Sequence, residues 1–263
     1  MVKKIIITGG LGYIGTELCK IYSGESWKNQ VTVIDNRFIS ERVNQLRNWN
    51  MNFVHADIRN SQDVKKYLNE ADVVHHLAGI TDVARTKEES NSNLDKELND
   101  VANKGTEIIL SETSKKCKII FPSTHVVFEG KTDLVENIKE DFEKLPILPY
   151  AISKDMNEEQ IKKSGKNFVI LRLASVYGYS TDTMRLNIMP NLFAKITSQN
   201  GIIRLFGGGK QLKTLVPLID TVRCFKFMEE RNDLKSDIFN LTKDTISVKE
   251  VAEIYKKINP KIT

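Results

Sequence analysis

Short apolar runs alternate with amphipathic stretches along the first two-thirds of the chain. The runs are rich in isoleucine and valine, which is typical of strands buried on both faces of a parallel sheet. The expected strands are residues 5–7, 31–34, 52–56, 72–77, 118–122 and 168–173. The stretches between them predict helices at 12–23, 40–48, 61–69, 94–116 and 151–164. This alternation predicts an α/β fold with a Rossmann-type, doubly wound parallel sheet and right-handed crossovers.

Beyond residue 173 the pattern changes to shorter pieces. It predicts helices at 189–198, 218–229 and 248–258, with strands at 202–206, 212–217 and near Ile238. We therefore expect a large Rossmann domain over residues 1–173 and a smaller C-terminal α/β lobe over residues 174–263. The chain ends soon after the last expected helix, so this lobe is either short or truncated.

A glycine-rich turn, in the sequence TGGLGYIG, joins the first strand to the first helix. Gly9 permits a turn that a side chain would block, Gly12 lets a pyrophosphate approach the backbone, and Gly15 allows the helix to pack close to the sheet. The helix N-terminus then faces the phosphates. The turn therefore predicts a dinucleotide site.

An acid follows at the end of the second strand, where a dinucleotide fold needs one. Asp35 can accept hydrogen bonds from the adenosine ribose and would repel a 2′-phosphate, which favours NAD over NADP. Arg37 and Arg42 follow closely and weaken that preference. The alternative is a tight turn with a solvated aspartate, which the combination of strand, glycines, helix and acid disfavours.

The next two strands also end in residues that suit a cofactor site. Asp57 either accepts the adenine amino group or caps the helix at 61–69. Residues 78–80, Ala-Gly-Ile, are small enough at Ala78 and Gly79 for the backbone to pass near the ribose and phosphates. His75 and His76 lie inside the fourth strand, and we expect them to be hydrogen-bonded core residues.

A tyrosine and a lysine four residues apart, in PYAISK, begin the helix after the fifth strand. This spacing places Tyr150 and Lys154 on one helix face. A phenol with a pKa near 10 acts as a base at neutral pH only if nearby positive charge lowers that pKa by several units. Behind a dinucleotide unit the pair predicts a proton-transfer site, whereas the alternative is two unrelated surface residues.

Several ordered motifs together resemble the extended short-chain dehydrogenase/reductase superfamily. Within it the chain is most similar to the NAD-dependent nucleotide-sugar epimerase/dehydratase family, of the UDP-glucose 4-epimerase type. The motifs are TGGLGYIG, Asp35-Asn36, Asp57-Ile58, HLAG, PST at 122–124, PYAISK and LRLASVYG. They span essentially the whole chain.

The resemblance implies a catalytic set and an NAD site in the large domain. Thr124 would bind the sugar hydroxyl, Tyr150 would exchange its proton, and Lys154 would hold the nicotinamide ribose and lower the tyrosine pKa. The positions expected to contact NAD are Gly9, Gly12, Tyr13, Ile14, Gly15, Asp35, Asn36, Asp57, Ile58, Leu77, Ala78, Gly79, Tyr150 and Lys154.

The C-terminal lobe would hold the substrate. The resemblance implies that Asn187 and Lys213 bind the nucleotide diphosphate, and Arg85 matches a frequent family arginine. Lys213 stands where many members have arginine, so it keeps the charge without the bidentate geometry. His125 either contacts the sugar or is a surface-loop histidine.

Two departures from the family pattern bear on the reaction. Members that dehydrate the sugar place an Asp-Glu pair after the catalytic threonine, where this chain has His125-Val126, so 4,6-dehydration is disfavoured. Ala102 replaces an asparagine usual in the family, which removes a side-chain contact near the cofactor.

Composition excludes several other classes of protein. The net charge of +5 arises from lysines interspersed with acids, without a basic stripe or module for nucleic acid. The three cysteines are far apart and predict neither a disulfide framework nor a metal site, which favours a reducing, cytoplasmic location. No apolar run is long enough to span a membrane.

The sequence thus predicts an NAD-dependent epimerase that acts on a nucleoside-diphosphate sugar through a transient 4-keto intermediate. The alternatives are a nucleotide-sugar reductase, dehydrogenase or dehydratase of the same superfamily, or a non-catalytic NAD-binding protein. Family precedent implies a homodimer through the helices at 94–116 and 151–164, and a role in cell-envelope polysaccharide synthesis.

Overall fold

The computed structural model describes residues 2–81, 92–131, 134–181 and 183–263. The large domain is built on a seven-stranded sheet with the order β3-β2-β1-β4-β5-β6-β9, in which neighbouring strands are parallel. Its strands are β1 (Lys3–Thr8), β2 (Asn29–Asp35), β3 (Asn52–His55), β4 (Val73–His76), β5 (Lys118–Thr124), β6 (Asn167–Leu173) and β9 (Asp237–Leu241). The predicted Rossmann-type sheet is confirmed.

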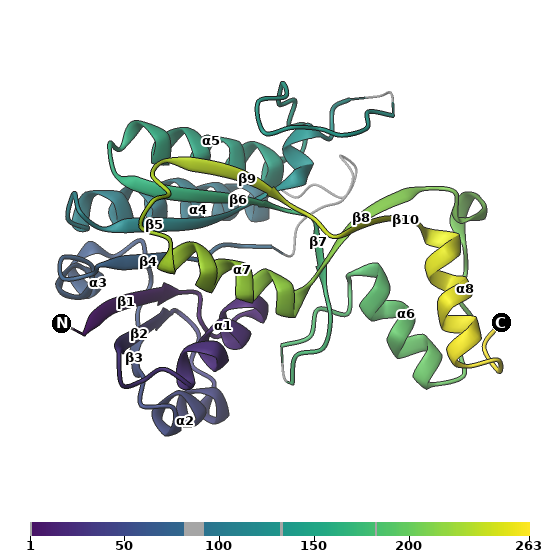
Figure 1. Cartoon of the computed structure of the whole chain (residues 1–263), viewed down its shortest axis with the longest axis horizontal. Coiled ribbons are helices and arrows are strands. Elements are labelled where there is room, and N and C mark those ends of the chain that lie inside the picture. Colours follow the sequence, from purple (N-terminus) through teal and green to yellow (C-terminus); the bar gives the residue numbers. More distant parts are fainter. Residues whose placement is uncertain (1, 82–91, 132–133, 182) are drawn as a thin grey trace.

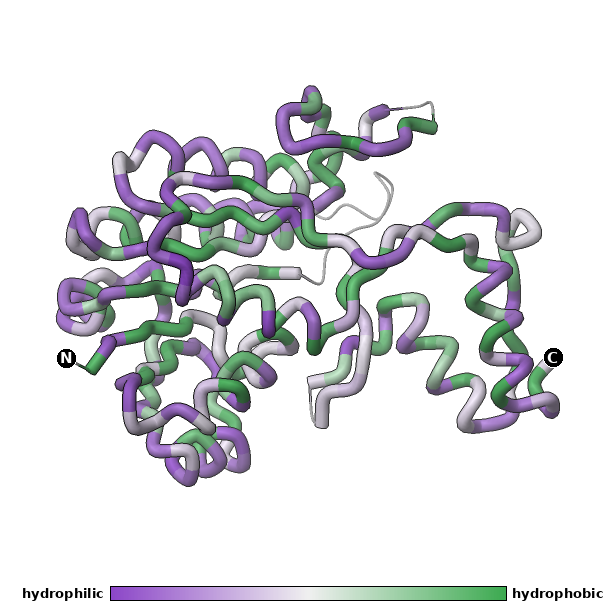
Figure 2. The backbone as a smooth tube through the Cα atoms, viewed as in Figure 1, coloured by the Kyte–Doolittle hydropathy of each residue, from purple (hydrophilic) through white to green (hydrophobic). Residues whose placement is uncertain are grey.

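Helices cover both faces of this sheet (Figure 1). One face packs against α1 (Tyr13–Ser23), α2 (Ser40–Asn48) and α7 (Leu218–Glu230). The other packs against α3 (Ser61–Leu68), α4 (Ser92–Glu112) and α5 (Pro149–Lys163). Ile5 and Ile7 belong to the first core and Ile6 to the second. The unbroken apolar run in β1 follows from this burial on both sides, and Figure 2 shows the hydrophobic colour along the central strands.

The smaller lobe has a three-stranded sheet of its own, in the order β10-β8-β7. Its elements are β7 (Ser175–Tyr177), α6 (Met189–Ser198), β8 (Leu212–Pro217), β10 (Asp244–Ser247) and α8 (Val248–Ile258). Phe193, Leu215 and Val251 form its small core, where α6 and α8 pack together. Within the described residues, no helix is both long and apolar enough to cross a lipid bilayer.

Two elements that follow residue 173 belong to the large domain. β9 pairs with β6 at the edge of the seven-stranded sheet. Helix α7 packs on the α1 side, where Val222 and Phe225 are fully buried. The small lobe is therefore formed by residues 174–217 and 242–263, and the chain returns to the large sheet between them.

The strand predicted at residues 202–206 is wrong. The segment runs without regular structure into a short 3-10 helix (Phe206–Gly209). Its backbone contributes one hydrogen bond to the chain end, from the Ile203 N–H to the Thr263 carbonyl, at 2.8 Å. The branched residues suggested a strand, but none of the described strands pairs with this segment, and the Ile203 and Leu205 side chains instead pack against the α6–α8 core.

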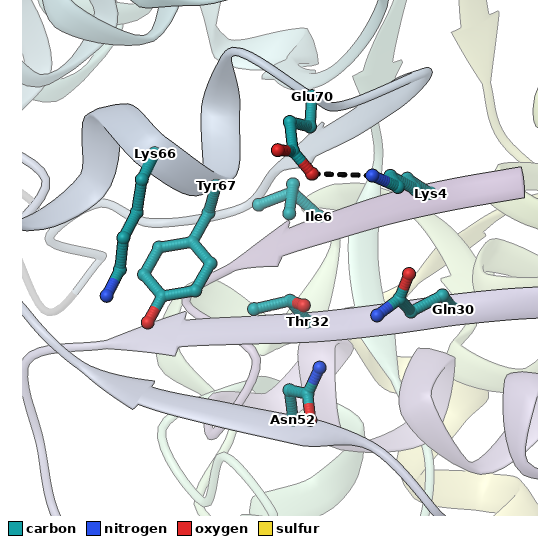
Figure 3. Close-up of a pocket in the computed structure, with 8 residues that line it drawn as sticks. All are labelled: Lys4, Ile6, Gln30, Thr32, Asn52, Lys66, Tyr67 and Glu70. Atoms are coloured by element: carbon teal, nitrogen blue, oxygen red, sulfur yellow. Dashed lines mark hydrogen bonds and ion pairs between the residues drawn. The ribbon is translucent and has the colours of Figure 1, made fainter.

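A polar depression of about 350 Å³ lies over β1, β2 and β3 on the α3 side (Figure 3). Gln30 and Thr32 line it, whereas Val31 and Val33, which alternate with them along β2, enter the α1-side core. Lys4 and Glu70 form an ion pair at its edge. None of the predicted site residues that the structure describes lines this depression, which lies away from the carboxyl ends of the strands.

Candidate active site

A cavity of about 1050 Å³ opens where the strands of the large sheet end and the small lobe begins. With one exception, every predicted site residue lines it: Gly9, Gly12, Tyr13, Ile14, Gly15, Asp35, Asn36, Asp57, Ile58, Leu77, Ala78, Gly79, Thr124, His125, Tyr150, Lys154, Asn187 and Lys213. The exception, Arg85, lies outside the described residues. Parallel strands place their carboxyl ends at one edge of the sheet, which explains why residues so far apart in sequence converge.

The glycine turn has the geometry that a phosphate cradle requires. Gly9 has φ +68°, and a Cβ there would lie 2.8 Å from the Ala78 backbone. A Cβ at Gly15 would lie 2.5 Å from the Gly9 carbonyl oxygen. Gly12 precedes α1 directly, so the free N–H groups of the first turn face the cavity. These residues fit the pyrophosphate of a dinucleotide.

Asp35 presents a buried carboxylate at the tip of β2. The Leu11 N–H donates to its Oδ2 at 3.0 Å, and the Arg37 N–H donates to its Oδ1 at 3.0 Å. The Arg37 guanidinium also pairs with it, with 3.3 Å between Nε and Oδ1. Arg42 donates to the Leu11 carbonyl at 2.5 Å. Both arginines that weakened the expected NAD preference thus bind protein groups: Arg37 pairs with Asp35, the acid predicted to bind the ribose, and Arg42 binds the Leu11 carbonyl.

Asp57 lines the cavity beyond the end of β3 and binds Arg59. The Arg59 N–H donates to its Oδ1 at 2.8 Å, and the guanidinium bonds both carboxylate oxygens. This pairing, opposed by partial burial and aided by Asn36, lowers the Asp57 pKa. The N-cap of α3 is Asn60, so Asp57 does not cap that helix. Its contact with adenine stays a prediction.

His76 is a core residue, as expected, and its hydrogen bonds shape the cavity floor. The Thr8 hydroxyl accepts from the Ala78 N–H at 3.2 Å and also shares a hydrogen bond with His76 Nδ1 at 3.0 Å. His76 Nε2 shares a second hydrogen bond, with the Thr106 hydroxyl, at 3.0 Å. Burial, and then the charge of Lys154, lower the His76 pKa to about 3. The neutral ring links β1, β4 and α4 beneath Ala78.

Thr124, Tyr150 and Lys154 come together at the end of β5 and the start of α5. The Thr124 hydroxyl accepts from the Val126 N–H at 3.3 Å, and its own proton stays available to Tyr150, whose pKa it lowers. The Lys154 ammonium lies 5.9 Å from the Tyr150 ring centroid and donates to the Pro122 carbonyl at 2.8 Å. The predicted helix face is therefore the one that meets the end of β5.

Burial disfavours the charged forms of both Tyr150 and Lys154. It raises the Tyr150 pKa, while the Arg185 charge and the Thr124 hydrogen bond oppose that rise. Burial lowers the Lys154 pKa to about 8. A neutral phenol beside an ammonium that titrates near neutral pH can exchange a proton once further positive charge enters the cavity.

His125, the residue after β5, lines the cavity near Lys213 of the small lobe. His125 is held by a bond from its Nδ1 to the Leu173 carbonyl at 2.9 Å, which leaves Nε2 as the acceptor of the neutral ring. Burial lowers its pKa, and the Lys213 charge adds to that effect. His125 is therefore an ordered wall residue and not a surface-loop histidine.

Arg185 is a site residue that the sequence did not reveal. Its Nη2 donates to the Thr81 carbonyl at 2.9 Å, which bridges the loop before α6 to the segment after β4. Its charge acts on both Tyr150 and Tyr13. The loop has no motif that distinguishes this arginine from a surface arginine.

A set of hydrogen bonds, which we call the Tyr13 clasp, ties the small lobe to α1. The clasp consists of Tyr13, Gly178 and Asn191. The Tyr13 hydroxyl donates to the Gly178 carbonyl at 2.6 Å and accepts from Asn191 Nδ2 at 3.2 Å. Asn191 Oδ1 in turn accepts from the Gly178 N–H at 2.9 Å. Beside it, the Ser180 hydroxyl donates to Glu17 of α1 at 2.9 Å. The lobe is thereby closed over the phosphate end of the cavity.

Fold and cavity together define a dinucleotide-dependent enzyme architecture, and comparison with known proteins specifies it. The model of the NAD dependent epimerase/dehydratase family matches residues 5–242, so the chain belongs to this family. NAD is the cofactor that the family description names. The family predicted from the motifs is confirmed.

Relatives of known activity are enzymes of nucleotide-sugar metabolism. The chain is 28% identical to a UDP-N-acetyl-alpha-D-glucosaminuronate decarboxylase of Bacillus cytotoxicus, over 96% of this chain and 79% of the relative. It is 25% identical to a UDP-glucose 4-epimerase of Mycoplasma genitalium, over 97% and 81%. Among solved structures, a UDP-glucuronic acid 4-epimerase of Bacillus cereus in complex with NAD superposes with a TM-score of 0.82 at 25% identity, covering 99% of this chain and 85% of that one. These relatives catalyse different reactions on similar substrates.

Proposed function

We propose that this protein is an NAD-dependent epimerase that acts on a nucleoside-diphosphate sugar through a transient 4-keto intermediate. The observation that carries the proposal is the convergence of Thr124, Tyr150 and Lys154 in the cavity that also contains the glycine turn, with the Lys154 ammonium 5.9 Å from the Tyr150 ring centroid. The NAD dependence of the family and the epimerases among its relatives support it.

Each of the three residues has a distinct task. NAD supplies the hydride acceptor and donor at the sugar carbon. Thr124 orients the C4 hydroxyl, and Tyr150 takes its proton and later returns one to the ketone oxygen. Lys154 holds the nicotinamide ribose and supplies the positive charge that lowers the tyrosine pKa. Rotation of the 4-keto sugar between the two hydride steps then inverts the carbon.

Substrate contacts follow from the small-lobe wall. Lys213 and Asn187 of the small lobe line the cavity, and we assign them to the nucleotide diphosphate. Arg85 completes the expected set. His125 at the end of β5 faces the sugar with an acceptor nitrogen, and its neutral ring replaces the acid pair that dehydration needs. This favours epimerisation over 4,6-dehydration.

The Tyr13 clasp favours epimerisation over net oxidation or reduction. An epimerase regenerates its cofactor in each cycle and has no need to release it, whereas a dehydrogenase or reductase must exchange it. A small lobe hydrogen-bonded to α1 suits a retained cofactor. A nucleotide-sugar reductase or dehydrogenase is the second candidate because it would use the same three residues.

Incubation with catalytic NAD and a panel of nucleotide sugars tests the proposal. The panel includes neutral and uronic acid sugars on UDP, GDP, CDP and dTDP, because Arg185 places a cation in the cavity beside Tyr150. We expect a new epimer without net NADH, abolished by Tyr150→Phe and unaffected by Tyr67→Phe in the remote depression. Stoichiometric NADH would instead indicate a dehydrogenase or reductase, and loss of carbon dioxide a decarboxylase.

We also propose that the protein forms a homodimer through α4 and α5. Ile152 and Met156 lie one turn apart on α5 and are 39% and 45% exposed, an apolar pair that suits a helix–helix interface. Light scattering should give twice the chain mass, and Met156→Glu should halve it. Ile254→Glu on α8, a residue that is 47% exposed, should leave the mass unchanged.

A further inference from the structure

A buried carboxylate lies one turn beyond Lys154 on α5. Glu158 has 0% of its side chain exposed, and its partner Arg172 of β6 has 2%. Arg172 bonds it through both prongs of the guanidinium, with Nε 2.9 Å from Oε1 and Nη2 2.8 Å from Oε2. Lys144 adds a third contact, 3.3 Å from Oε2. Four residues separate Glu158 from Lys154, so the two share a helix face.

The same carboxylate bonds the strand that carries Thr124. The Ser123 hydroxyl donates to Glu158 Oε1 at 2.5 Å, and Ser123 immediately precedes Thr124 on β5. Arg172 also donates from Nη1 to the Glu140 carbonyl at 2.8 Å, in the loop that leads to α5. Glu158 therefore connects the end of β5, strand β6 and the helix that carries Tyr150 and Lys154.

Charge at this position acts directly on the candidate site. Lys154 is surrounded by His76 from β4, by the Pro122 carbonyl from β5, and by Tyr150 and Glu158 from its own helix. Burial lowers the Lys154 pKa, and the negative charge of Glu158 opposes that fall. Burial likewise works against the charge of Glu158, but the bonds from Arg172 and Ser123 outweigh it and lower its pKa. Glu158 is thus ionised in the folded protein.

We propose that Glu158 is a positioning residue: it holds Thr124 and Lys154 in their relative places through Ser123 and α5, and it faces Lys154 with a fixed negative charge. Glu158 does not line the cavity that the described residues enclose, so it acts through its neighbours. The proposal rests on the assignment of Thr124, Tyr150 and Lys154 as the catalytic set.

Glu158→Gln tests the charge, because glutamine keeps the shape and an acceptor oxygen. An NMR titration of protein labelled with 13C-lysine follows Lys154 without any substrate, with Lys154→Arg to assign its signal. We expect the Lys154 midpoint to fall by about half a pH unit or more, since a nearby opposite charge favours the ammonium form. Glu159→Gln, which removes the neighbouring carboxylate that also binds Lys144, should leave the midpoint in place. A wild-type midpoint in Glu158→Gln would overturn this part of the proposal.

Ser123→Ala tests whether Glu158 positions Thr124. It leaves every buried charge paired, so it remains a usable test even if Glu158→Gln does not fold. We expect an unchanged Lys154 midpoint, while kcat falls by about tenfold with little change in KM, because misplacing a reacting group slows the chemical step more than binding. A wild-type kcat, or a midpoint shift as large as that of Glu158→Gln, would refute the positioning. If no panel sugar is turned over by the wild type, the proposed function fails, whereas the titration still decides the role of Glu158.

Discussion

Removal of the Tyr13 hydroxyl should release the cofactor faster. In Tyr13→Phe the aromatic ring stays, but the bond to the Gly178 carbonyl at 2.6 Å and the bond from Asn191 at 3.2 Å are both lost. The loop that these bonds hold also contributes Thr183 and Arg185 to the cavity wall. We expect NAD to leave past this wall, by movement of the loop away from α1.

The size of the effect follows from the two bonds. Each net hydrogen bond contributes about 0.5–1.5 kcal/mol, so their loss weakens the closed arrangement by about 1–3 kcal/mol. Since each 1.4 kcal/mol corresponds to a factor of ten, NAD release should become about 5- to 150-fold faster. The remaining bond between the Ser180 hydroxyl and Glu17 of α1 would limit the effect to the lower half of that range.

A chase experiment measures this rate: protein loaded with a fluorescent NAD analogue is mixed with excess NAD and the signal is followed over time. Tyr255→Phe is the matched control, because its hydroxyl donates to the Pro190 carbonyl at 2.9 Å in the same lobe without contacting α1. If Tyr13→Phe and Tyr255→Phe both release the analogue at the wild-type rate, the clasp does not retain the cofactor.

Three further changes have outcomes that the structure predicts. In Gly15→Ala the new Cβ would lie 2.5 Å from the Gly9 carbonyl oxygen and force α1 away from the turn. Calorimetry should therefore show NAD binding weakened by about tenfold or more, while circular dichroism shows that the protein stays folded. Asp35→Asn should weaken NAD binding and reduce the ratio of NAD affinity to NADP affinity, because it removes the carboxylate that pairs with Arg37 and would repel a 2′-phosphate. An unchanged affinity ratio would argue against the ribose contact. Burial lowers the His75 pKa to about 3. Below pH 6.5 the unfolded chain therefore binds a proton at His75 that the folded protein does not, so the free energy of unfolding declines as the pH falls from 6.5 to 3. In urea unfolding at pH 7 and 5, His75→Phe should show a shallower decline than the wild type, by up to about 1.4 kcal/mol per pH unit, and equal slopes would exclude this role for the ring.

Local chemistry made the nucleotide end of the site predictable. The branched run of β1, the positive φ at Gly9 and the acid at the end of β2 each depend on a few consecutive residues. Helical spacing likewise indicates that Tyr150 and Lys154 share one face of α5. These signals depend on backbone sterics and periodicity, which neighbouring residues determine.

Contacts between distant segments could not be predicted in the same way. Tyr13 meets Gly178 across 165 positions, and Arg185 reaches Thr81 across 104. β7 and β10 have three and four residues, too few to show a period, and they are strands because β8 lies between them. The segment at 202–206 shows the opposite case, because its branched residues suggested a strand, but no strand in the described ranges pairs with it.

The path of the chain between the two lobes restricts how they can move and how they can be separated. The polypeptide crosses from one lobe to the other at Ala174, at the junction of β8 with α7, and between β9 and β10. The three crossings lie side by side, because Ala174 bonds to Leu241 and β7 pairs with β8, so we expect them to limit twisting of the small lobe over the large domain. A fragment that stops at residue 173 would lose β9 and α7, expose the edge of β6 and uncover α1, and should aggregate. The large domain is thus discontinuous in sequence, because α7 and β9, which complete it, follow the first segment of the small lobe.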